Sequence, residues 1–199
     1  MFKFNEESAL EEQGSSLGRI LDTGVYDVTI KTISEVVAGT GTKGVDISYQ
    51  VEGAKYPNVI YGLWFQKANG DDINFQKAKL NSLVGLTPNK TVTVYDKTIE
   101  VKDGNKVVKA WKELDDFPCK MVIQKIFDYY NGEVREKNEV VAFLGTDGKT
   151  YAESVKGSDA KQLKYYTEKL TNVVTEAYKK YQADGGDTTE EAEETGSLL

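Results

Sequence analysis

Apolar and polar residues alternate with a period of two in three segments of the first third of the chain. The clearest alternation covers residues 45–51, and similar patterns cover residues 25–31 and 59–66. This pattern is typical of β-strands that have one buried face. Short turns that contain glycine, at residues 38–44 and 53–57, separate the segments. The sequence therefore predicts three consecutive strands joined as an antiparallel meander.

The third of these strands carries a tryptophan on its outward face. Alternation places Tyr61 and Leu63 on the inward face of this strand, and it places Tyr49 on the inward face of the preceding strand. The same alternation directs Trp64 outward. The alternative is that Trp64 covers an apolar gap against Trp111, because tryptophan is highly buried on average.

The apolar spacing becomes helical after Gly70. We expect a helix there, with Asp72 as its N-cap and Gly85 at its end. Strand patterns return at residues 91–101 and 106–111, on either side of an Asp-Gly-Asn turn. This arrangement predicts a β-hairpin.

The last third of the chain is expected to hold two more strands, a long helix and a tail. Strand patterns cover residues 120–130 and 134–144. Residues 158–181 carry one apolar stripe at helical spacing, which predicts a single amphipathic helix with Ser158 as its cap. Residues 183–199 are rich in Gly, Thr, Glu and Asp and cannot bury enough apolar surface to fold.

Together these elements predict a mainly β fold with helices. Three strands, a helix and two strands are the chain order of the OB-fold, a five-stranded Greek-key barrel. A half-open β-roll would give the same order. The hairpin is then an insertion and the long helix an addition at the C-terminal end. We expect one domain over residues 21–182, between a flexible arm at residues 1–20 and a disordered acidic tail at residues 183–199.

The composition excludes several kinds of functional site. The 199 residues include no histidine and a single cysteine, Cys119. An internal disulfide, a cysteine-built zinc site and a Ser-His or Cys-His pair are therefore excluded. We expect a buried thiol, no metal, no cofactor and no enzymatic activity. The sequence shows no secretory signal and no apolar run of about 20 residues, so we expect a cytoplasmic protein that does not enter a membrane.

Acidic residues are concentrated at the two ends of the chain. Residues 183–199 hold six acidic residues and no Lys or Arg, and residues 1–12 hold four glutamates against Lys3. The whole chain has a net charge of −7, so residues 13–182 carry a net charge of +2. Blocks of like charge are typical of interaction tails. A basic middle segment is compatible with a nucleic-acid partner.

An outward tryptophan among lysines suggests an interface for single-stranded nucleic acid. In an OB barrel, single strands lie on the outer face of strands two and three. An exposed aromatic ring there can stack on a base with little sequence preference, while lysines contact phosphates. Two tyrosines beside the last turn are expected to line a second edge of the groove. The predicted set is Lys31, Lys43, Trp64, Lys67, Lys120, Lys125, Tyr129 and Tyr130.

Three features carry a resemblance to a known family. They are the strand Gly24-Val25-Tyr26-Asp27-Val28-Thr29-Ile30 with those after it, the helix before the fourth strand, and the tail Glu190-Glu-Ala-Glu-Glu-Thr-Gly-Ser-Leu-Leu199. In these features, over roughly residues 20–145 and the last seventeen residues, the chain resembles phage replicative single-stranded-DNA-binding proteins. The resemblance implies an OB-fold that binds single-stranded DNA during phage replication or recombination, in the cytoplasm of an infected bacterium.

The same resemblance implies a tail that recruits replication proteins, such as a DNA polymerase or a helicase. Tails of this type commonly end in Phe, whereas this chain ends in two leucines. A partner's docking pocket would therefore differ. The expected partner-binding residues are Asp184, Asp187, Glu190, Glu191, Glu193, Glu194, Leu198 and Leu199.

Three alternatives remain open on the sequence. The chain could be an acidic β-barrel adaptor or inhibitor that binds a host protein without touching DNA. The Glu-x-Lys spacing at Glu100 and Lys102 occurs in metal-dependent nucleases, although the second acid that such enzymes need is missing from a neighbouring strand. The helix at residues 158–181 could back the barrel or form a homodimer contact.

Overall fold

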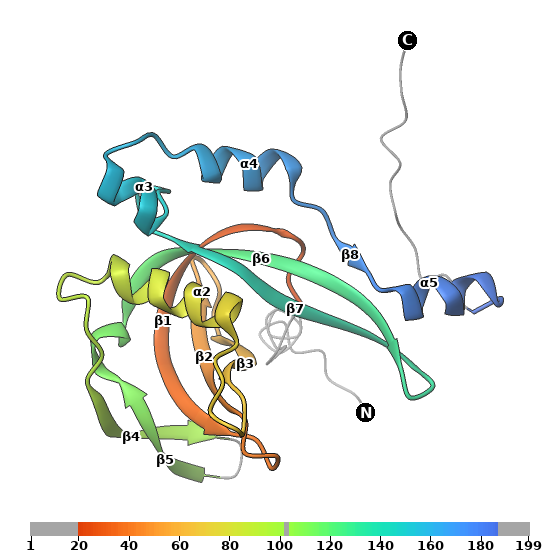
Figure 1. Ribbon diagram of the computed structural model, residues 1–199, viewed down its shortest axis with the longest axis horizontal. Coiled ribbons are helices and arrows are strands. Elements are labelled where there is room, and N and C mark those ends of the chain that lie inside the picture. The colour runs from red at the N-terminus through yellow and green to blue at the C-terminus, as the bar shows by residue number, and fades with distance from the viewer. Residues whose placement is uncertain (1–19, 102–103, 187–199) are drawn as a thin grey trace, which may run out of the picture.

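The computed structural model describes residues 20–101 and 104–186, which form a curved β-sheet with short helices around it (Figure 1). The first three strands are β1 (Gly24–Val37), β2 (Lys43–Val51) and β3 (Asn58–Gln66). β2 pairs antiparallel with both β1 and β3. The predicted meander is therefore confirmed.

The later strands also form where alternation predicts them. The remaining elements are α2 (Asn74–Leu86), β4 (Val94–Val101), β5 (Gly104–Trp111), the 3-10 turn η1 (Lys112–Leu114), β6 (Phe117–Tyr130), β7 (Glu133–Leu144), α3 (Tyr151–Lys156), α4 (Lys161–Lys169), β8 (Val173–Val174) and α5 (Glu176–Ala183). β4 pairs with β5, and β6 pairs with β7, each as an antiparallel hairpin. The predicted hairpin and the two later strands are thus confirmed.

β1 is the strand that joins the two halves of the sheet. It pairs with β2 along most of its length, while residues 24–30 also pair with β6. Near its other end, Ser34 pairs with Ala110 of β5. An irregularity in the ladder between Ile30 and Thr32 separates the two regions. Bulges of this kind bend a strand, so one strand can serve both parts of the sheet.

The expected closed five-stranded barrel is not formed. Among the described strands, β3 pairs only with β2, and β7 pairs only with β6. The sheet is therefore open between β3 and β7. The chain passes this opening at Leu21, whose N–H donates to Asn138 Oδ1 at 2.7 Å. Asn138 Nδ2 donates back to the Leu21 carbonyl at 2.7 Å. Alternation identifies buried faces but does not specify whether two distant strand edges will pair.

The concave side of the sheet encloses the hydrophobic core. Its largest fully buried side chains include Tyr49, Phe143, Ile33 and Leu83 of α2. Burial raises the pKa of Tyr49 to about 12, although a hydrogen bond with Asn58 opposes the rise. Tyr49 and Leu63 are therefore core residues, as predicted.

The expected helix over residues 158–181 is wrong. Two shorter helices, α4 and α5, lie on either side of β8, which pairs in parallel with β6. The segment Thr171–Thr175 contains four β-branched residues, which favour extended backbone over helix. Ala160 takes the N-cap position of α4, so Ser158 does not cap that helix. No helix in the described ranges is long and apolar enough to cross a membrane.

The ends of α2 also differ from expectation. Ile73 takes its N-cap position without a capping side chain, whereas Asp72 pairs with Lys77 at 2.6 Å. Gly85 lies inside the helix, which continues to Leu86. A Cβ at Gly85 would lie 2.7 Å from the ring of Tyr151. Gly85 therefore permits α3 to pack closely, a role that the sequence alone does not distinguish from a helix stop.

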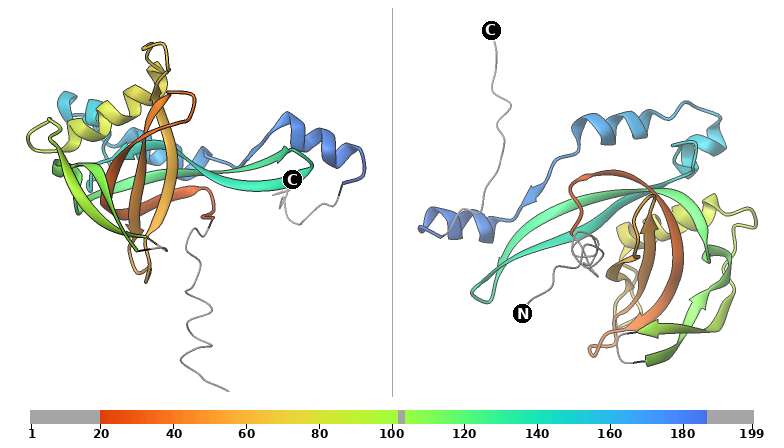
Figure 2. Two further views of the ribbon diagram at one scale, coloured as in Figure 1. Left: turned by 90° about the horizontal axis from the view of Figure 1, so that it is seen from below. Right: turned by 180° about the vertical axis from the view of Figure 1, so that it is seen from behind.

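The outer half of the β6–β7 hairpin, residues 124–139, extends beyond β1 and is named the hairpin arm (Figures 1 and 2). α5 packs against it. Tyr178 is 3% exposed and lies 5.9 Å from Phe127 between ring centroids. Ala183 is the last residue of α5 and Asp184 is its C-cap residue, so the first two residues of the expected tail belong to the end of this helix. Residues 1–19 of the expected N-terminal segment, residues 1–20, and the other named tail residues lie outside the described residues.

Thr175→Ala is expected to loosen α5 locally. The Thr175 hydroxyl accepts a hydrogen bond from the Tyr178 N–H at 3.3 Å and donates one to Asp128 at 2.8 Å. Loss of an N-cap costs about 0.5–2 kcal/mol. Amide hydrogen exchange in α5 should accelerate accordingly, while exchange in β1 is unchanged. Thr171→Ala, which removes an exposed side chain without a capping role, is the control, and equal rates in both variants would contradict the prediction.

Candidate nucleic-acid interface

β3 contains a bulge at its centre. Val45 pairs with Leu63 and Ile47 pairs with Ile60, so two residues of β3 face one residue of β2, Asp46. The extra residue is Gly62, whose φ of +64° lies in the left-handed region. Glycine adopts this conformation readily, whereas other residues do not. A glycine inside a strand pattern is a known sign of such a bulge.

The bulge reverses the direction expected for Tyr61. Ile60 and Leu63 are 8% and 5% exposed, whereas Tyr61 is 76% exposed. The prediction that Tyr61 belongs to the core is therefore wrong. Because the extra residue at Gly62 shifts the alternation by one, Tyr61 and Trp64 both lie on the outward face of β3. Tyr61 was not among the predicted interface residues, although Gly62 was a signal in the sequence for its outward position.

Trp64 lies over two glycines on the outward face of the sheet. A Cβ at Gly44 would lie 2.6 Å from its ring, and a Cβ at Gly62 would lie 2.7 Å from it. One face of the indole therefore rests against backbone, and the side chain remains partly exposed. Trp111 belongs instead to the core, and its indole N–H donates to Glu35 at 3.1 Å. The two tryptophans have separate surroundings.

Two of the predicted lysines lie near Trp64. Lys43 is exposed at the start of β2, opposite Gln66, and Lys67 is exposed directly after β3. The turns that carry them meet, since a Cβ at Gly41 would lie 3.3 Å from the Cβ of Ala68. Within the described chain, neither lysine side chain forms an ion pair. Both ammonium groups are available to an anionic ligand.

The other three predicted lysines are in ion pairs. Lys31 lies 2.8 Å from Asp116, and Lys120 lies 2.5 Å from Asp27. Lys125 lies 3.0 Å from Glu136, and its side chain is only 17% exposed. The structure does not bring these lysines together with Trp64 as free cations. Spacing along a strand indicates its outward residues but not the acids of neighbouring segments.

The two predicted tyrosines lie on the hairpin arm. Tyr129 stacks on Tyr181 of α5 with ring centroids 4.3 Å apart. Tyr130 is 57% exposed, and the Arg135 guanidinium lies over its ring at 5.3 Å. Figures 1 and 2 show the tip of this arm far from the β1–β2 turn, where Lys43 lies. The tyrosines therefore do not share one groove with Trp64.

A cavity of about 250 Å³ adjoins Tyr61 at the opening between β3 and β7. Asn58 and Tyr61 line it from β3, and Lys137 and Asn138 line it from β7. Lys137 also lies 3.6 Å from Asp128. The outward face of β3 thus leads from Lys43 and Lys67, past Trp64 and Tyr61, to a third lysine, Lys137, that the sequence did not suggest.

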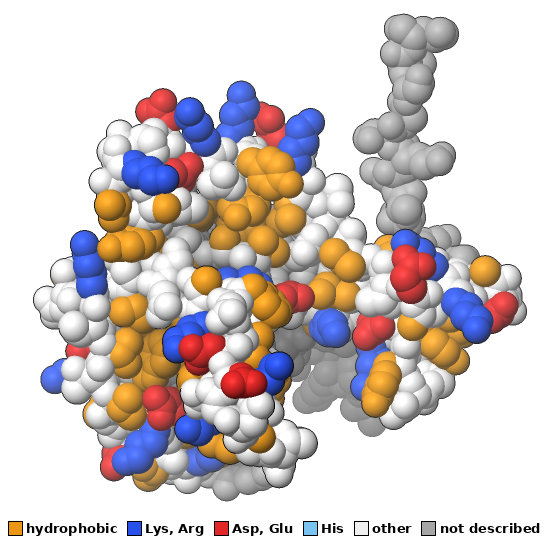
Figure 3. Space-filling model, in the orientation of Figure 1, with side chains coloured by type: hydrophobic (Ala, Val, Ile, Leu, Met, Phe, Trp, Pro, Cys, Tyr) orange, Lys and Arg blue, Asp and Glu red, His pale blue; other side chains and the backbone are white. Residues whose placement is uncertain are grey.

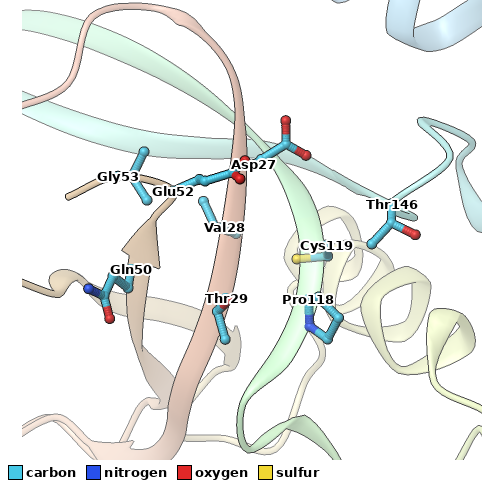
Figure 4. Close-up of a pocket in the computed structure, with 10 residues that line it drawn as sticks. Asp27, Val28, Thr29, Gln50, Glu52, Gly53, Pro118, Cys119 and Thr146 are labelled. Atoms are coloured by element: carbon cyan, nitrogen blue, oxygen red, sulfur yellow. The ribbon is translucent and has the colours of Figure 1, made fainter.

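A second cavity, of about 360 Å³, lies between β1, the end of β2 and β6 (Figure 4). Its lining includes the acidic residues Asp27 and Glu52, which disfavour a phosphate ligand. Cys119 also contributes to the lining, but the residue is 1% exposed. Burial, with the nearby charge of Asp27, raises the pKa of this thiol to about 12. Cys119 is therefore a buried thiol, as predicted, and a poor nucleophile near neutral pH.

Acidic and basic side chains are interspersed over the face shown in Figure 3, with no separate basic patch. Residues 20–101 and 104–186 contain no group of three His, Cys, Asp or Glu side chains placed to hold a metal. The acid nearest to the Glu-x-Lys motif upstream is Asp96, on the same strand as Glu100, and it is paired with Lys109 at 2.7 Å. Lys102 of the motif lies outside the described residues.

Comparison of the chain with protein-family models found no match. Comparison with curated protein sequences found no match either. The candidate interface therefore rests on its own geometry.

Proposed function

We propose that this chain binds single-stranded DNA without sequence preference, on the outward face of β3. One observation carries the proposal: the Trp64 ring lies over Gly44 and Gly62, on the same face as the exposed ring of Tyr61. A ring supported by backbone on one side can receive a base on the other. Stacking of this kind accepts any base, because every base has a π face.

The spacing of the two rings suits successive bases. Apart from the extra residue at Gly62, Tyr61 and Trp64 occupy alternate strand positions, which are about 7 Å apart along a strand. Lys43 and Lys67 at one end supply cations for the phosphates. Lys137 at the other end is paired with Asp128 at 3.6 Å and would have to leave that partner to contact a phosphate. The single-stranded DNA would cross the opening between β3 and β7.

The pairing order supports an OB-like interpretation. β3, β2, β1, β6 and β7 are neighbours in that order, with α2 packed against both β3 and β7. We interpret this order as that of a five-stranded Greek-key barrel left open between β3 and β7. The β4–β5 hairpin is then an insertion. With the resemblance of the strands and tail, this order supports a non-enzymatic role in phage DNA replication or recombination.

The salt dependence of binding tests the proposal. Log K for an oligo-dT probe should fall with log salt by about 0.7 for each phosphate contacted. Lys43→Gln with Lys67→Gln should reduce that slope by about 1.4, because two contacts are lost. Fluorescence anisotropy over a salt series measures both quantities. Lys109→Gln removes a lysine that pairs with Asp96 on the β4–β5 hairpin, and it should leave the slope unchanged.

Other outcomes would identify the alternatives. A protein that fails to bind the probe at any salt would favour the adaptor or inhibitor. Degradation of the probe that requires magnesium would favour the nuclease. A slope that is identical in the double variant and in Lys109→Gln would exclude Lys43 and Lys67 from the interface.

A further inference from the structure

Asp46 makes a hydrogen bond that holds the bulge of β3. Its Oδ1 accepts the N–H of Gly62 at 2.8 Å. A bulge leaves its extra residue out of the regular ladder, so the N–H of that residue needs another acceptor. Asp46 lies opposite the bulge, on the outward face between Gly44 and Ser48. The carboxylate therefore replaces the missing ladder partner.

The position of Trp64 depends on this local geometry. A side chain at Gly62 would be strained at φ +64°, and its Cβ would lie 2.7 Å from the indole. The indole also covers Gly44 of the neighbouring strand, where a Cβ would lie 2.6 Å from the ring. The indole of Trp64 can lie against Gly44 and Gly62 only while the bulge keeps its shape. Without the bulge, Tyr61 would turn toward the core, because a one-residue shift reverses every side chain of a strand.

We infer that Asp46 is a positioning residue of the interface, which acts through Gly62 to keep Tyr61 and Trp64 on one face. This inference rests on the proposed function for its effect on DNA affinity. A carboxylate on this face repels phosphate, so a direct contact by Asp46 would oppose binding. Its favourable contribution is geometric. The charge effect and the geometric effect have opposite signs, and two substitutions separate them.

Asp46→Ala removes the acceptor together with the charge, whereas Asp46→Asn removes only the charge. We expect Asp46→Ala to weaken binding of oligo-dT toward the limit set by Trp64→Ala, about 5- to 150-fold. Asp46→Asn should bind as tightly as the wild type or more tightly. When Trp64 is already replaced by alanine, Asp46→Ala should lower the affinity for oligo-dT clearly less than it does in the wild type.

A second measurement needs no DNA. Iodide quenching of tryptophan fluorescence reports chiefly on Trp64, because Trp111 is only 8% exposed. Asp46→Ala should change the quenched fraction, and Asp46→Asn should restore the wild-type value. Gly62→Ala disturbs the same geometry while keeping the carboxylate, and it should change the quenching as Asp46→Ala does. If Asp46→Ala does not fold, Gly62→Ala decides by the same two measurements.

The outcomes separate this inference from the proposed function. If folded Asp46→Ala matches the wild type in quenching and in affinity, Asp46 positions nothing and the inference is overturned. If Asp46→Ala and Asp46→Asn change affinity equally without a change in quenching, the effect is one of charge, which also overturns it. If Trp64→Ala binds DNA as the wild type does, the proposed interface fails, while the quenching data still decide the role of Asp46.

Discussion

Replacement of both Tyr61 and Trp64 by alanine is expected to weaken binding of single-stranded DNA by roughly 2–6 kcal/mol, which is about 30- to 20,000-fold in Kd. Each ring offers one stacking surface, and loss of a stacked base costs about 1–3 kcal/mol. Tyr61 is 76% exposed and belongs to no core cluster, so its removal should not affect folding. Anisotropy titrations with oligo-dT and oligo-dA probes measure the loss, which should be similar for both.

Two controls make this result specific. Tyr61→Phe with Trp64→Phe keeps a ring at each position and should retain most of the affinity. Tyr165→Ala removes a tyrosine of α4 that is 55% exposed, and it should leave binding unchanged. If the double alanine variant binds as tightly as Tyr165→Ala, the strand does not lie on the outward face of β3.

The position of Tyr61 illustrates how far the sequence could predict this site. Alternation correctly placed every strand of the meander, because one face of each is buried. It failed at Tyr61 because a strict period of two has no place for an extra residue. Gly62 carried the missing information, but its φ of +64° depends on the ladder with β2 and on the Asp46 carboxylate. The partner of a backbone N–H is a tertiary property.

The lysines show a second limit of the same kind. Lys120 and Lys125 both lie on the predicted strand β6, yet both are in ion pairs. The partner of Lys125, Glu136, lies on the adjacent strand β7. Asp27 pairs with Lys120 across the β1–β6 ladder, ninety-three residues away in sequence. The turns next to Lys43 and Lys67 approach each other at Gly41 and Ala68, which are also separated in sequence. Which cations remain free is decided by non-local pairing, and so is the opening between β3 and β7.

The break in the predicted C-terminal helix changes the expected origin of the tail. In the structure, Tyr181 stacks on Tyr129, and the Gly186 N–H donates to the Tyr181 carbonyl at 3.0 Å. The tail therefore starts from the hairpin arm. Thirteen extended residues beyond Gly186 could span at most roughly 43–47 Å, which allows the tail to reach toward the sheet.

Deletion of residues 187–199 is expected to tighten single-strand binding, most strongly at low salt. We propose that the carboxylates of Asp187, Glu190, Glu191, Glu193 and Glu194 compete with phosphates for the lysines of the interface. If each contributes about 0.3 kcal/mol, near the low end for exposed ion pairs, the five together give about 1.5 kcal/mol, or roughly tenfold in Kd. The gain should vanish near 1 M salt, where the screening length falls to about 3 Å. A truncation after Gly186 keeps α5 and its capping bonds, so it changes the tail alone.

The matched control keeps the length of the tail and removes its charge, through Asp187→Asn and glutamine at the four glutamates. This variant should bind DNA as tightly as the truncated protein, because the competition is electrostatic. Leu198→Ala with Leu199→Ala should leave DNA affinity unchanged. If the last two leucines dock in an apolar, basic-rimmed pocket of a replication partner, such as a DNA polymerase or helicase, the same variant should not bind that partner. Anisotropy titrations over a salt series compare all four proteins. If the truncated protein binds DNA no tighter than the full chain at any salt, the tail does not compete for the interface. If the truncated protein binds more tightly but the charge-neutralised protein does not, the effect comes from the bulk of the tail and not from its charge.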